Sequence, residues 1–291
     1  MSEGTQHNVD EKMREFYEAM VVDLGRSRTT ARVRKVIVAS TLRELGREPQ
    51  PADIDRRKRT LIMAGRTPDH ARNMVFAFRD YFAFCGRMEE AAALTPPKRG
   101  KPKVPRYLTA DEVRAILGNV EDKRDAALLY LIAYTGLRVH ESLKLRPADI
   151  NLETRTLSIV GKGGKSAVIP IGAPAIPHLR EWLEVRSQDA ETVFYQQLGS
   201  GGPLARKHAP LSCERVRAIV RRYARRAGIT RRVTPHMFRH ALATNLLEAG
   251  CPLPFVQRQL RHADIKTTMI YLHASDRAFQ ENFDRFLPQY G

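Results

Sequence analysis

The segment from Thr95 to Arg106, TPPKRGKPKVPR, constrains the fold of this chain more than any other stretch. Its four prolines and five basic residues cannot form a helix or a central strand, because proline lacks an amide hydrogen and fixes its own φ angle. We therefore interpret residues 95–106 as an extended, positively charged linker. The linker predicts one domain over residues 1–94 and a second domain that begins at residue 107.

Apolar spacing predicts four helices before the linker. Residues 1–9 are polar and are expected to be disordered, whereas apolar residues recur at helical spacing from Asp10 onward. A second helix is expected to begin at a cap formed by Thr29 or Thr30, and a third to cover 52–63. The fourth carries one apolar stripe that we assign to the core of a helical bundle. The stripe consists of Ala71, Met74, Phe78, Phe82 and Cys85.

The region after the linker opens with helix signals. Thr109 and Glu112 have the spacing of a capping box, which predicts a helix over 110–117. A second helix is expected over 122–135, where Gly136 ends it.

Two apolar runs, 156–160 and 167–171, flank the glycine-rich sequence GKGGK and predict a β-hairpin. This tip lacks the Walker pattern and its following helix, so it does not indicate a nucleotide site. Residues 188–210 read as weakly structured, and Ser212 is expected to cap a strongly basic helix. The chain is therefore predicted to be mainly α, with an α-rich second domain that contains a small antiparallel sheet.

The charge balance indicates a nucleic-acid partner. There are 49 Lys and Arg residues against 32 Asp and Glu residues, a formal net charge of +17. Such a surplus favours binding to phosphates, because their neutralisation releases counterions. No basic amphipathic helix stands apart from the globular segments, so a membrane surface is disfavoured. The residues that we expect to contact DNA are Arg32, Lys35, Lys98, Lys101, Lys103, Arg106, Lys165, Arg221 and Arg225.

Cysteine usage and hydropathy bound the class further. The three cysteines are scattered and never form a Cys-x-x-Cys pair, which disfavours a disulfide framework or a structural zinc site. The N-terminus has no apolar signal region, and the longest apolar run, 126–137, is too short to span a bilayer. We interpret that run as a buried core helix and expect a cytoplasmic protein.

The segment from 234 to 273 concentrates reactive side chains. Thr234 and Pro235 predict a helix start. On that helix His236, Arg239 and His240 lie at i, i+3 and i+4, and therefore on one face. The two histidines have metal-ligand spacing, but no third ligand is evident, so no metal is expected.

Two further residues complete this segment. A second helical stretch over 254–260 leads to His262, and Tyr271 follows on a third short helix. Imidazoles, a guanidinium and a phenol can together bind a phosphodiester and attack it. Earlier in the second domain, Arg138 and Glu141 share one face of a short helical turn at i, i+3.

Four motifs now stand in a fixed order: TGLRVHE, GKGGK, TPHMFRH and LRHADIKTTMIYLH. In this order the sequence resembles the tyrosine recombinases, the phage-integrase family, and most closely its Xer-like members, over nearly the whole chain. The resemblance implies an N-terminal four-helix, SAM-like core-binding domain and a tyrosine recombinase catalytic fold over 107–273. It also implies a tail helix over 274–291. The tail's apolar stripe (Phe279, Phe283, Phe286) could dock on a neighbouring subunit or pack on its own domain.

The resemblance assigns the chemistry residue by residue. Tyr271 matches the nucleophile that attacks a scissile DNA phosphate, giving a 3′-phosphotyrosyl link and a free 5′-hydroxyl. Arg138 and Arg239 match the two arginines that bind the non-bridging oxygens. Lys162 matches the general acid that protonates the leaving 5′-oxygen, and Lys165 is its rival at the same hairpin tip.

The remaining matches concern support of the site. His236 and His262 match the family's two histidines, and Glu141 matches the acidic position that supports the site from behind. Arg261 departs from the pattern, because the family usually has glycine before the second histidine. The arginine could add a phosphate contact or alter the local turn.

The sequence thus predicts a site-specific DNA recombinase that acts on double-stranded DNA without ATP, metal or another cofactor. The family works as a tetramer on two duplexes, while the free chain could be a monomer or need an accessory DNA-binding protein. We expect it to be nucleoid-associated. The alternatives are a type IB topoisomerase-like nicking–closing enzyme and an architectural DNA-binding protein with a vestigial site. The small helical domain and the tail favour recombination over the first, and the full set of six candidate catalytic residues argues against the second.

Overall fold

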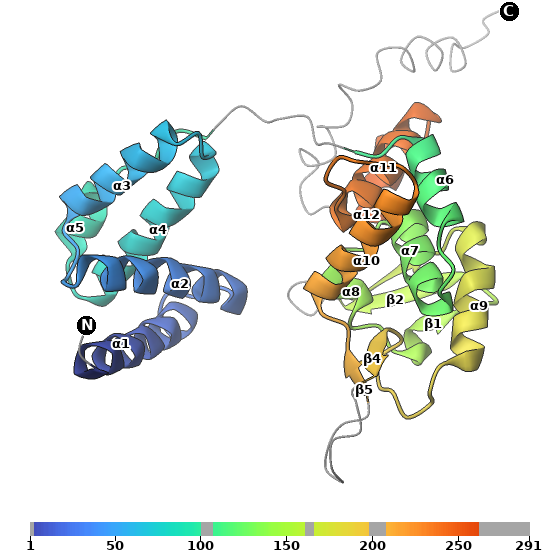
Figure 1. The fold of residues 1–291 in the computed structure, drawn as a ribbon, viewed down its shortest axis with the longest axis horizontal. Helices are drawn as coiled ribbons and strands as arrows, with labels where there is room; N and C mark the ends of the chain where they lie inside the picture. Colours follow the sequence, from blue (N-terminus) through green and yellow to red (C-terminus); the bar gives the residue numbers. More distant parts are fainter. Residues whose placement is uncertain (1–2, 100–106, 161–165, 198–207, 262–291) are drawn as a thin grey trace, which may run out of the picture. The chain divides into compact units, whose positions relative to one another are not determined.

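The computed structural model of the chain describes residues 3–99, 107–160, 166–197 and 208–261 (Figure 1). It divides into two compact units, Met1–Pro102 and Lys103–Gly291, which we term the N-terminal and C-terminal units. Helices dominate both units, and the strands of the described residues all lie in the C-terminal unit. The predicted mainly α class, with a small antiparallel sheet in the second part of the chain, is therefore confirmed.

Local capping explains where the N-terminal helices begin. The Oγ of Ser27 accepts a hydrogen bond from the Thr30 backbone N–H at 3.2 Å, so the predicted cap at Thr29 or Thr30 is wrong. Both threonines lie inside the first turn. The expected disorder over 1–9 is also wrong for most of that stretch, because the first helix begins at Glu3 and Val9 packs against the core. The helices are α1 Glu3–Val22, α2 Arg28–Leu45, α3 Pro51–Met63, α4 Pro68–Phe84 and α5 Met88–Ala93.

The core of the N-terminal unit is built around α4. Phe78, Tyr81 and Phe82 are fully buried, and Phe16 of α1 packs edge-on against Tyr81 with 5.4 Å between ring centroids. Burial of such aromatic rings contributes most of the apolar area of a small core. The predicted stripe on α4 is confirmed as core, although Cys85 is only half-buried. The short helix α5 was not among the four that the sequence predicted.

Helix caps also set the C-terminal unit. Thr109 Oγ1 accepts from the Glu112 N–H at 3.2 Å, and Glu112 Oε2 accepts from the Thr109 N–H at 2.9 Å, which confirms the capping box. Ser212 Oγ accepts from the Arg215 N–H at 3.1 Å, as predicted. The α-helices are α6 Ala110–Gly118, α7 Lys123–Thr135, α8 Val139–Ser142, α9 Ile176–Val185, α10 Cys213–Arg226, α11 Pro235–Glu248 and α12 Leu253–Leu260.

Two antiparallel sheets accompany these helices. The first has the order β1-β2-β3, formed by Ile150–Asn151, Thr156–Val160 and Ser166–Pro170. The predicted hairpin is confirmed, with Leu157 paired to Ile169. The second sheet pairs β4 (Tyr195–Gln197) with β5 (His208–Pro210), within the stretch that the sequence marked as weakly structured. Strands of three residues are too short to show a period of two, so no pattern in the sequence indicated this sheet. The described residues before it, 188–194, contain neither helix nor strand, as predicted.

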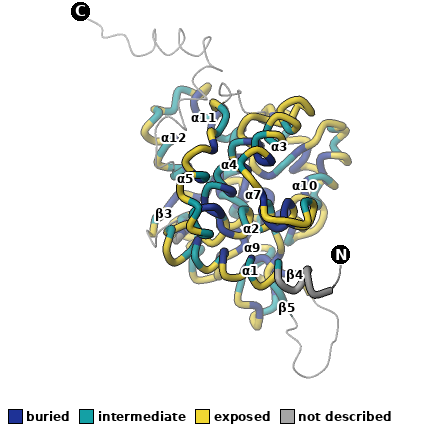
Figure 2. Tube along the Cα trace, turned by 90° about the vertical axis from the view of Figure 1, so that its left-hand side faces the viewer, coloured by how far each residue is buried: buried dark blue, intermediate teal, exposed yellow. Residues whose placement is uncertain are grey.

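Helix α7 is the centre of the C-terminal unit. The apolar run 126–137 forms this helix and its end, and Leu128, Leu129 and Ile132 are fully buried, which confirms a core helix (Figure 2). None of the described helices is long and apolar enough to cross a membrane. Gly136 ends α7 in the left-handed conformation, with φ at 67°. The candidate site begins at this turn.

Candidate active site

The turn after α7 is packed tightly against α11 and α12. A Cβ atom on Gly136 would lie 2.6 Å from Leu260 Cδ2 and 3.1 Å from Leu242 Cδ2, so both φ and space require glycine. Arg239 of α11 is 3% exposed, and its guanidinium donates to the backbone carbonyls of Gly136 and Leu260. Arg239 therefore ties the end of α7 to the end of α12.

Arg138 and Glu141 meet at the start of α8. Arg138 is the N-cap residue; its backbone N–H donates to Glu141 Oε2 at 2.8 Å and its Nη1 to Oε1 at 3.0 Å. Glu141 is buried, whereas the side chain of Arg138 is 33% exposed. Burial alone would raise the pKa of Glu141, but the Arg138 N–H and the guanidiniums of Arg261 and Arg138 lower it below its usual value. The structure thus brings the predicted clamp residue and its acidic support together.

Arg261 joins this pair from the end of α12. Its Nη2 donates to Glu141 Oε2 at 2.5 Å, and its side chain is 13% exposed. The residue adopts the left-handed conformation with φ at 53°, which costs a non-glycine residue roughly 1–2 kcal/mol. The family's usual glycine suits this turn because glycine favours the left-handed conformation. Arginine stands here instead, and its side chain binds a buried carboxylate. Local sequence spacing gave no signal for a contact across 120 residues.

A second contact at the end of α12 was also invisible in the sequence. Gln259 Nε2 donates to the carbonyl of Thr135 at 3.0 Å and to that of Pro170 at 3.3 Å. These bonds connect α12 to the ends of α7 and β3. The turn that bears Arg261 is therefore held by side chains from its own helix as well as by Glu141.

The two histidines of α11 lie in a positive environment. Partial desolvation lowers the pKa of His236, and the charges of Arg239 and Arg138 lower it further, although the residue as a whole is exposed. The pKa of His240 falls to about 4, through burial first and then through His236 and Arg239. Both imidazoles are therefore neutral at pH 7. Pro235 occupies the first helical position as predicted, but the predicted side-chain cap by Thr234 is wrong, since it makes no capping hydrogen bond with the described residues.

Comparison with known proteins decides the class. The sequence model described as the phage integrase family matches residues 106–278, more than half of the chain. The chain belongs to the phage integrase family. It is 34% identical over 264 residues to the tyrosine recombinase XerA of Pyrococcus furiosus, which covers 90% of this chain and 89% of that protein. It is 33% identical to XerC of Xanthomonas campestris, over 77% of this chain and 70% of the relative. The chain is therefore a tyrosine-type DNA recombinase of the Xer-like kind.

Solved structures agree with this class. A crystal structure of XerA recombinase aligns with a TM-score of 0.54 and 26% identity, and covers 97% of this chain and 100% of that one. XerH bound to a palindromic difH substrate aligns with a TM-score of 0.68 over 89% of this chain and 79% of XerH, at 23% identity, which shows a shared fold. The predicted tyrosine recombinase fold is confirmed.

Several predicted site residues of the recombinase lie outside the described residues. They are Lys162, Lys165, His262, Tyr271, Lys101, Lys103, Arg106 and the tail 274–291. The described part of the site therefore consists of Arg138, Glu141, His236 and Arg239, joined by Arg261. Among the other predicted DNA contacts, Arg32, Lys98 and Arg225 are exposed, and Lys35 and Arg221 are partly exposed. Arg221 also donates to Glu214 at 3.2 Å, which reduces the charge that it offers to a phosphate.

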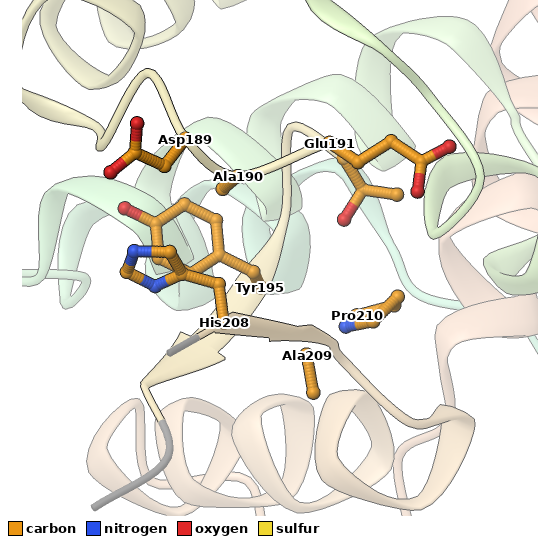
Figure 3. A pocket seen from close by; sticks show the side chains of 8 residues that line it. Asp189, Ala190, Glu191, Tyr195, His208, Ala209 and Pro210 are labelled. Carbon is orange, nitrogen blue, oxygen red and sulfur yellow. The ribbon is translucent and has the colours of Figure 1, made fainter. Parts of the chain in front are cut away.

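A pocket of about 480 Å³ elsewhere in the C-terminal unit does not belong to this site (Figure 3). Asp189, Glu191, Tyr195 and His208 line it, and none of the predicted catalytic residues that the structure describes is among its lining residues. Two carboxylates would repel a DNA phosphate. Across the described residues no three His, Cys, Asp or Glu side chains are grouped so that they could hold a metal ion.

Proposed function

We propose that this recombinase breaks and rejoins DNA through a covalent tyrosine–phosphate intermediate. The Oη of Tyr271 attacks the scissile phosphorus and forms a P–Oη bond while the bond from phosphorus to the 5′-oxygen breaks. Lys162 donates a proton to the leaving 5′-oxygen, and His236 or His262 accepts the phenolic proton. The products are a 3′-phosphotyrosyl ester and a free 5′-hydroxyl. Attack by the 5′-hydroxyl of another strand reverses the chemistry and joins the exchanged strands.

The arginine cluster around the α7–α8 turn carries this proposal. Negative charge builds on the non-bridging phosphate oxygens in the transition state, and fixed guanidiniums with forked donors suit that charge. One third of the Arg138 side chain is open to solvent. The guanidinium of Arg239 donates to the carbonyl of Gly136, which precedes Arg138 by two residues. The buried Glu141 holds Arg138 through both its backbone and its side chain. This arrangement supports a preorganised site for one phosphate.

The histidine environment supports the proton transfers. A phenol has an ordinary pKa of about 10 and needs a base to react at neutral pH. The lowered pKa of His236 keeps its imidazole neutral at pH 7, the form that can accept a proton. Nearby positive charge also favours the phenolate form of an approaching tyrosine.

The energetics and the partner follow from the same chemistry. Each step exchanges one phosphate ester for another, so the bond energy is retained and strand joining needs neither ATP nor a metal. The XerH complex with its difH substrate supports duplex DNA as the substrate of this chain. We propose a tetramer on two duplexes, with the tail 274–291 as the segment that contacts a neighbouring subunit.

Trapping of the covalent intermediate tests the proposal. The probe is a library of duplexes with randomised flanks and a bridging 5′-phosphorothiolate at a fixed position, analysed on a denaturing gel. A thiolate leaves without a proton but cannot rejoin efficiently, so the intermediate should accumulate. We expect a protein–DNA band with the wild-type chain and none with Tyr271→Phe, while both bind DNA equally. A band that persists in Tyr271→Phe, or no band despite tight binding, would contradict the proposal.

The same variants separate recombination from the topoisomerase-like alternative. Sequencing of the trapped DNA should return one preferred site if the enzyme is site-specific. Two duplexes that carry this site should then exchange strands and give recombinant products. Relaxation of any supercoiled plasmid without recombinant products would favour a nicking–closing enzyme instead.

A further inference from the structure

The carboxylate of Glu141 is shared by two arginines from distant parts of the chain. Arg138 donates its backbone N–H at 2.8 Å and its Nη1 at 3.0 Å, and Arg261 donates its Nη2 at 2.5 Å. Both Glu141 oxygens are therefore occupied. Arg261 is less exposed than Arg138, at 13% against 33%, so Arg261 faces the carboxylate rather than solvent.

The backbone at Arg261 indicates that the side chain matters. A non-glycine residue is disfavoured in the left-handed region, and such strain persists only where the surroundings compensate for it. Arg261 has φ at 53°, and within the described part of the chain its side chain bonds to Glu141 and, more weakly, to the carbonyl of Gln259 at 3.4 Å. Glycine would satisfy the turn alone, without strain. What arginine adds at this position, compared with glycine, is therefore its guanidinium group.

Charge balance shows what the guanidinium supplies. Arg138 and Glu141 alone form a neutral pair, in which the carboxylate opposes the attraction of Arg138 for a phosphate. Arg261 adds one positive charge, which offsets the carboxylate. Among the described residues, the positive groups that act on the neighbouring His236 are Arg239, Arg138, Arg217 and, when protonated, His140.

We propose that Arg261 is a positioning residue for Arg138, acting through Glu141: it fixes the shared carboxylate and offsets its charge, so that Arg138 presents its remaining N–H groups and its positive charge to the scissile phosphate. This inference rests on the proposed tyrosine-mediated cleavage. In the described residues only Nη1 of the Arg138 side chain donates to a protein group, which leaves Nε and Nη2 for the phosphate. Arg261 itself acts from behind the reacting atoms.

The first experiment measures the initial rate of covalent complex formation with the randomised library described above, made both with the phosphorothiolate and with the ordinary phosphate. Arg261→Met removes the charge and keeps a long side chain, Arg261→Gly removes the strain as well, and Arg261→Lys restores the charge. Arg258→Met is the matched control, because Arg258 is an exposed arginine on the same helix. DNA affinity and the thermal unfolding midpoint are measured for every variant.

We expect Arg261→Met and Arg261→Gly to slow covalent complex formation by on the order of 10- to 10²-fold with both leaving groups, because a displaced binding group costs rate through lost orientation. DNA affinity should change less than about threefold. A thiolate needs no protonation, so a defect that persists with it lies at the phosphate oxygens rather than at Lys162. Arg261→Lys should keep part of the wild-type rate. The control Arg258→Met should keep the full wild-type rate.

A double-mutant cycle checks that the effect passes through Glu141. In a Glu141→Gln background the carboxylate charge is already absent, so Arg261→Met should cost little more. Wild-type rates in Arg261→Met, additive losses in the double variant, or a loss matched by DNA affinity would each overturn the proposal. The last result would instead make Arg261 a direct DNA contact.

A spectroscopic measurement distinguishes failure of this inference from failure of the cleavage mechanism. The Arg138 Nε–H resonance is observed in ¹⁵N-labelled protein during titration with inorganic phosphate. We expect a defined, phosphate-sensitive signal in the wild type and Arg261→Lys, and a broadened or phosphate-insensitive one in Arg261→Met. This result without any Tyr271-dependent covalent band would overturn the mechanism and retain the positioning role. An unchanged signal in Arg261→Met would overturn the positioning role alone.

Discussion

Two buried carboxylates in the C-terminal unit are each bonded by two arginines, but only one of them lies at the candidate active site. Asp125, at the start of α7, is fully buried and binds Arg124 Nη2 at 2.8 Å and Arg222 Nη2 at 2.5 Å. The Tyr223 hydroxyl donates to it at 3.3 Å, and the Arg222 guanidinium lies 4.6 Å from the Tyr223 ring centroid. These contacts join α10 to α7.

The Glu141 cluster also consists of one carboxylate and two arginines, but different charged groups surround it. The Asp125 N–H is capped by a second carboxylate, Asp122, at 2.9 Å, which brings the charge of two guanidiniums and two carboxylates to zero. At the candidate site, burial first and then the charges of Arg239 and Arg138 lower the pKa of His236. The comparison teaches that a buried ion pair does not mark a site by itself. A group of like charges that also shifts the pKa of a neighbouring histidine is the better marker.

The largest expected effect separates the two clusters by activity. Arg138→Ala should reduce the rate of covalent complex formation by on the order of 10²–10³, the usual cost of one donor to the transition state. Arg222→Ala removes the corresponding arginine of the Asp125 cluster and should leave the rate within about threefold. Quantification of the trapped complex over time measures both. Equal losses in the two variants would mean that the clusters are not distinct in function.

The free energy of unfolding should depend more on the Asp125 cluster than on the Glu141 cluster, the reverse of the ranking by cleavage rate. Asp125→Ala leaves two guanidiniums without their counterion and should lower the free energy of unfolding by about 2–3 kcal/mol, below the 3–5 kcal/mol of a fully buried pair because both arginines reach solvent. Their side chains are 21% and 51% exposed. Glu141→Gln keeps the shape and should cost only about 1 kcal/mol while it slows cleavage. Urea unfolding and the trapping assay, run on the same preparations, test this reversal.

The sequence predicted the local parts of both regions and missed their long-range contacts. The capping box of Thr109 and Glu112, the Ser212 cap and the stop at Gly136 depend on residues within four positions, so patterns of residue type identify them. The bond from Arg261 to Glu141 depends on how α12 packs against α8, which no local pattern records. The pairing of β4 with β5 was missed for a different reason, because strands of three residues are too short to show an alternating pattern.

The sequence also identified the candidate site more by chemistry than by geometry. The spacing of Arg138 and Glu141 placed them on one face, and the structure brings them to 3.0 Å. The departure at Arg261 was visible as an arginine where a related chain would have glycine, but its partner was not. Residue types and their spacing do not show how many partners a buried carboxylate has. Only the fold reveals that two arginines share Glu141.

The tight turn between the helices gives an intermediate effect. Gly136→Ala should lower the free energy of unfolding by about 2 kcal/mol or more, because alanine is disfavoured at this φ and its Cβ would overlap Leu260. Gly228→Ala is the matched control: its φ is 76°, yet no atom lies within 4 Å of the added Cβ, so it should cost about 1 kcal/mol. Urea unfolding compares them. Equal costs would mean that α11 and α12 move aside readily and that Arg239 does not depend on this turn.

The smallest expected effect at neutral pH concerns His240 and the pH dependence of stability. His240 has a pKa of about 4 in the folded protein against an ordinary value of 6.5, so the unfolded chain binds its proton first as pH falls. Stability should therefore be full above pH 6.5 and decline progressively towards about pH 4. His240→Gln should flatten that decline, as measured by urea midpoints at pH 7.0, 6.0 and 5.0. A decline of unchanged steepness in His240→Gln would show that another group is responsible for it.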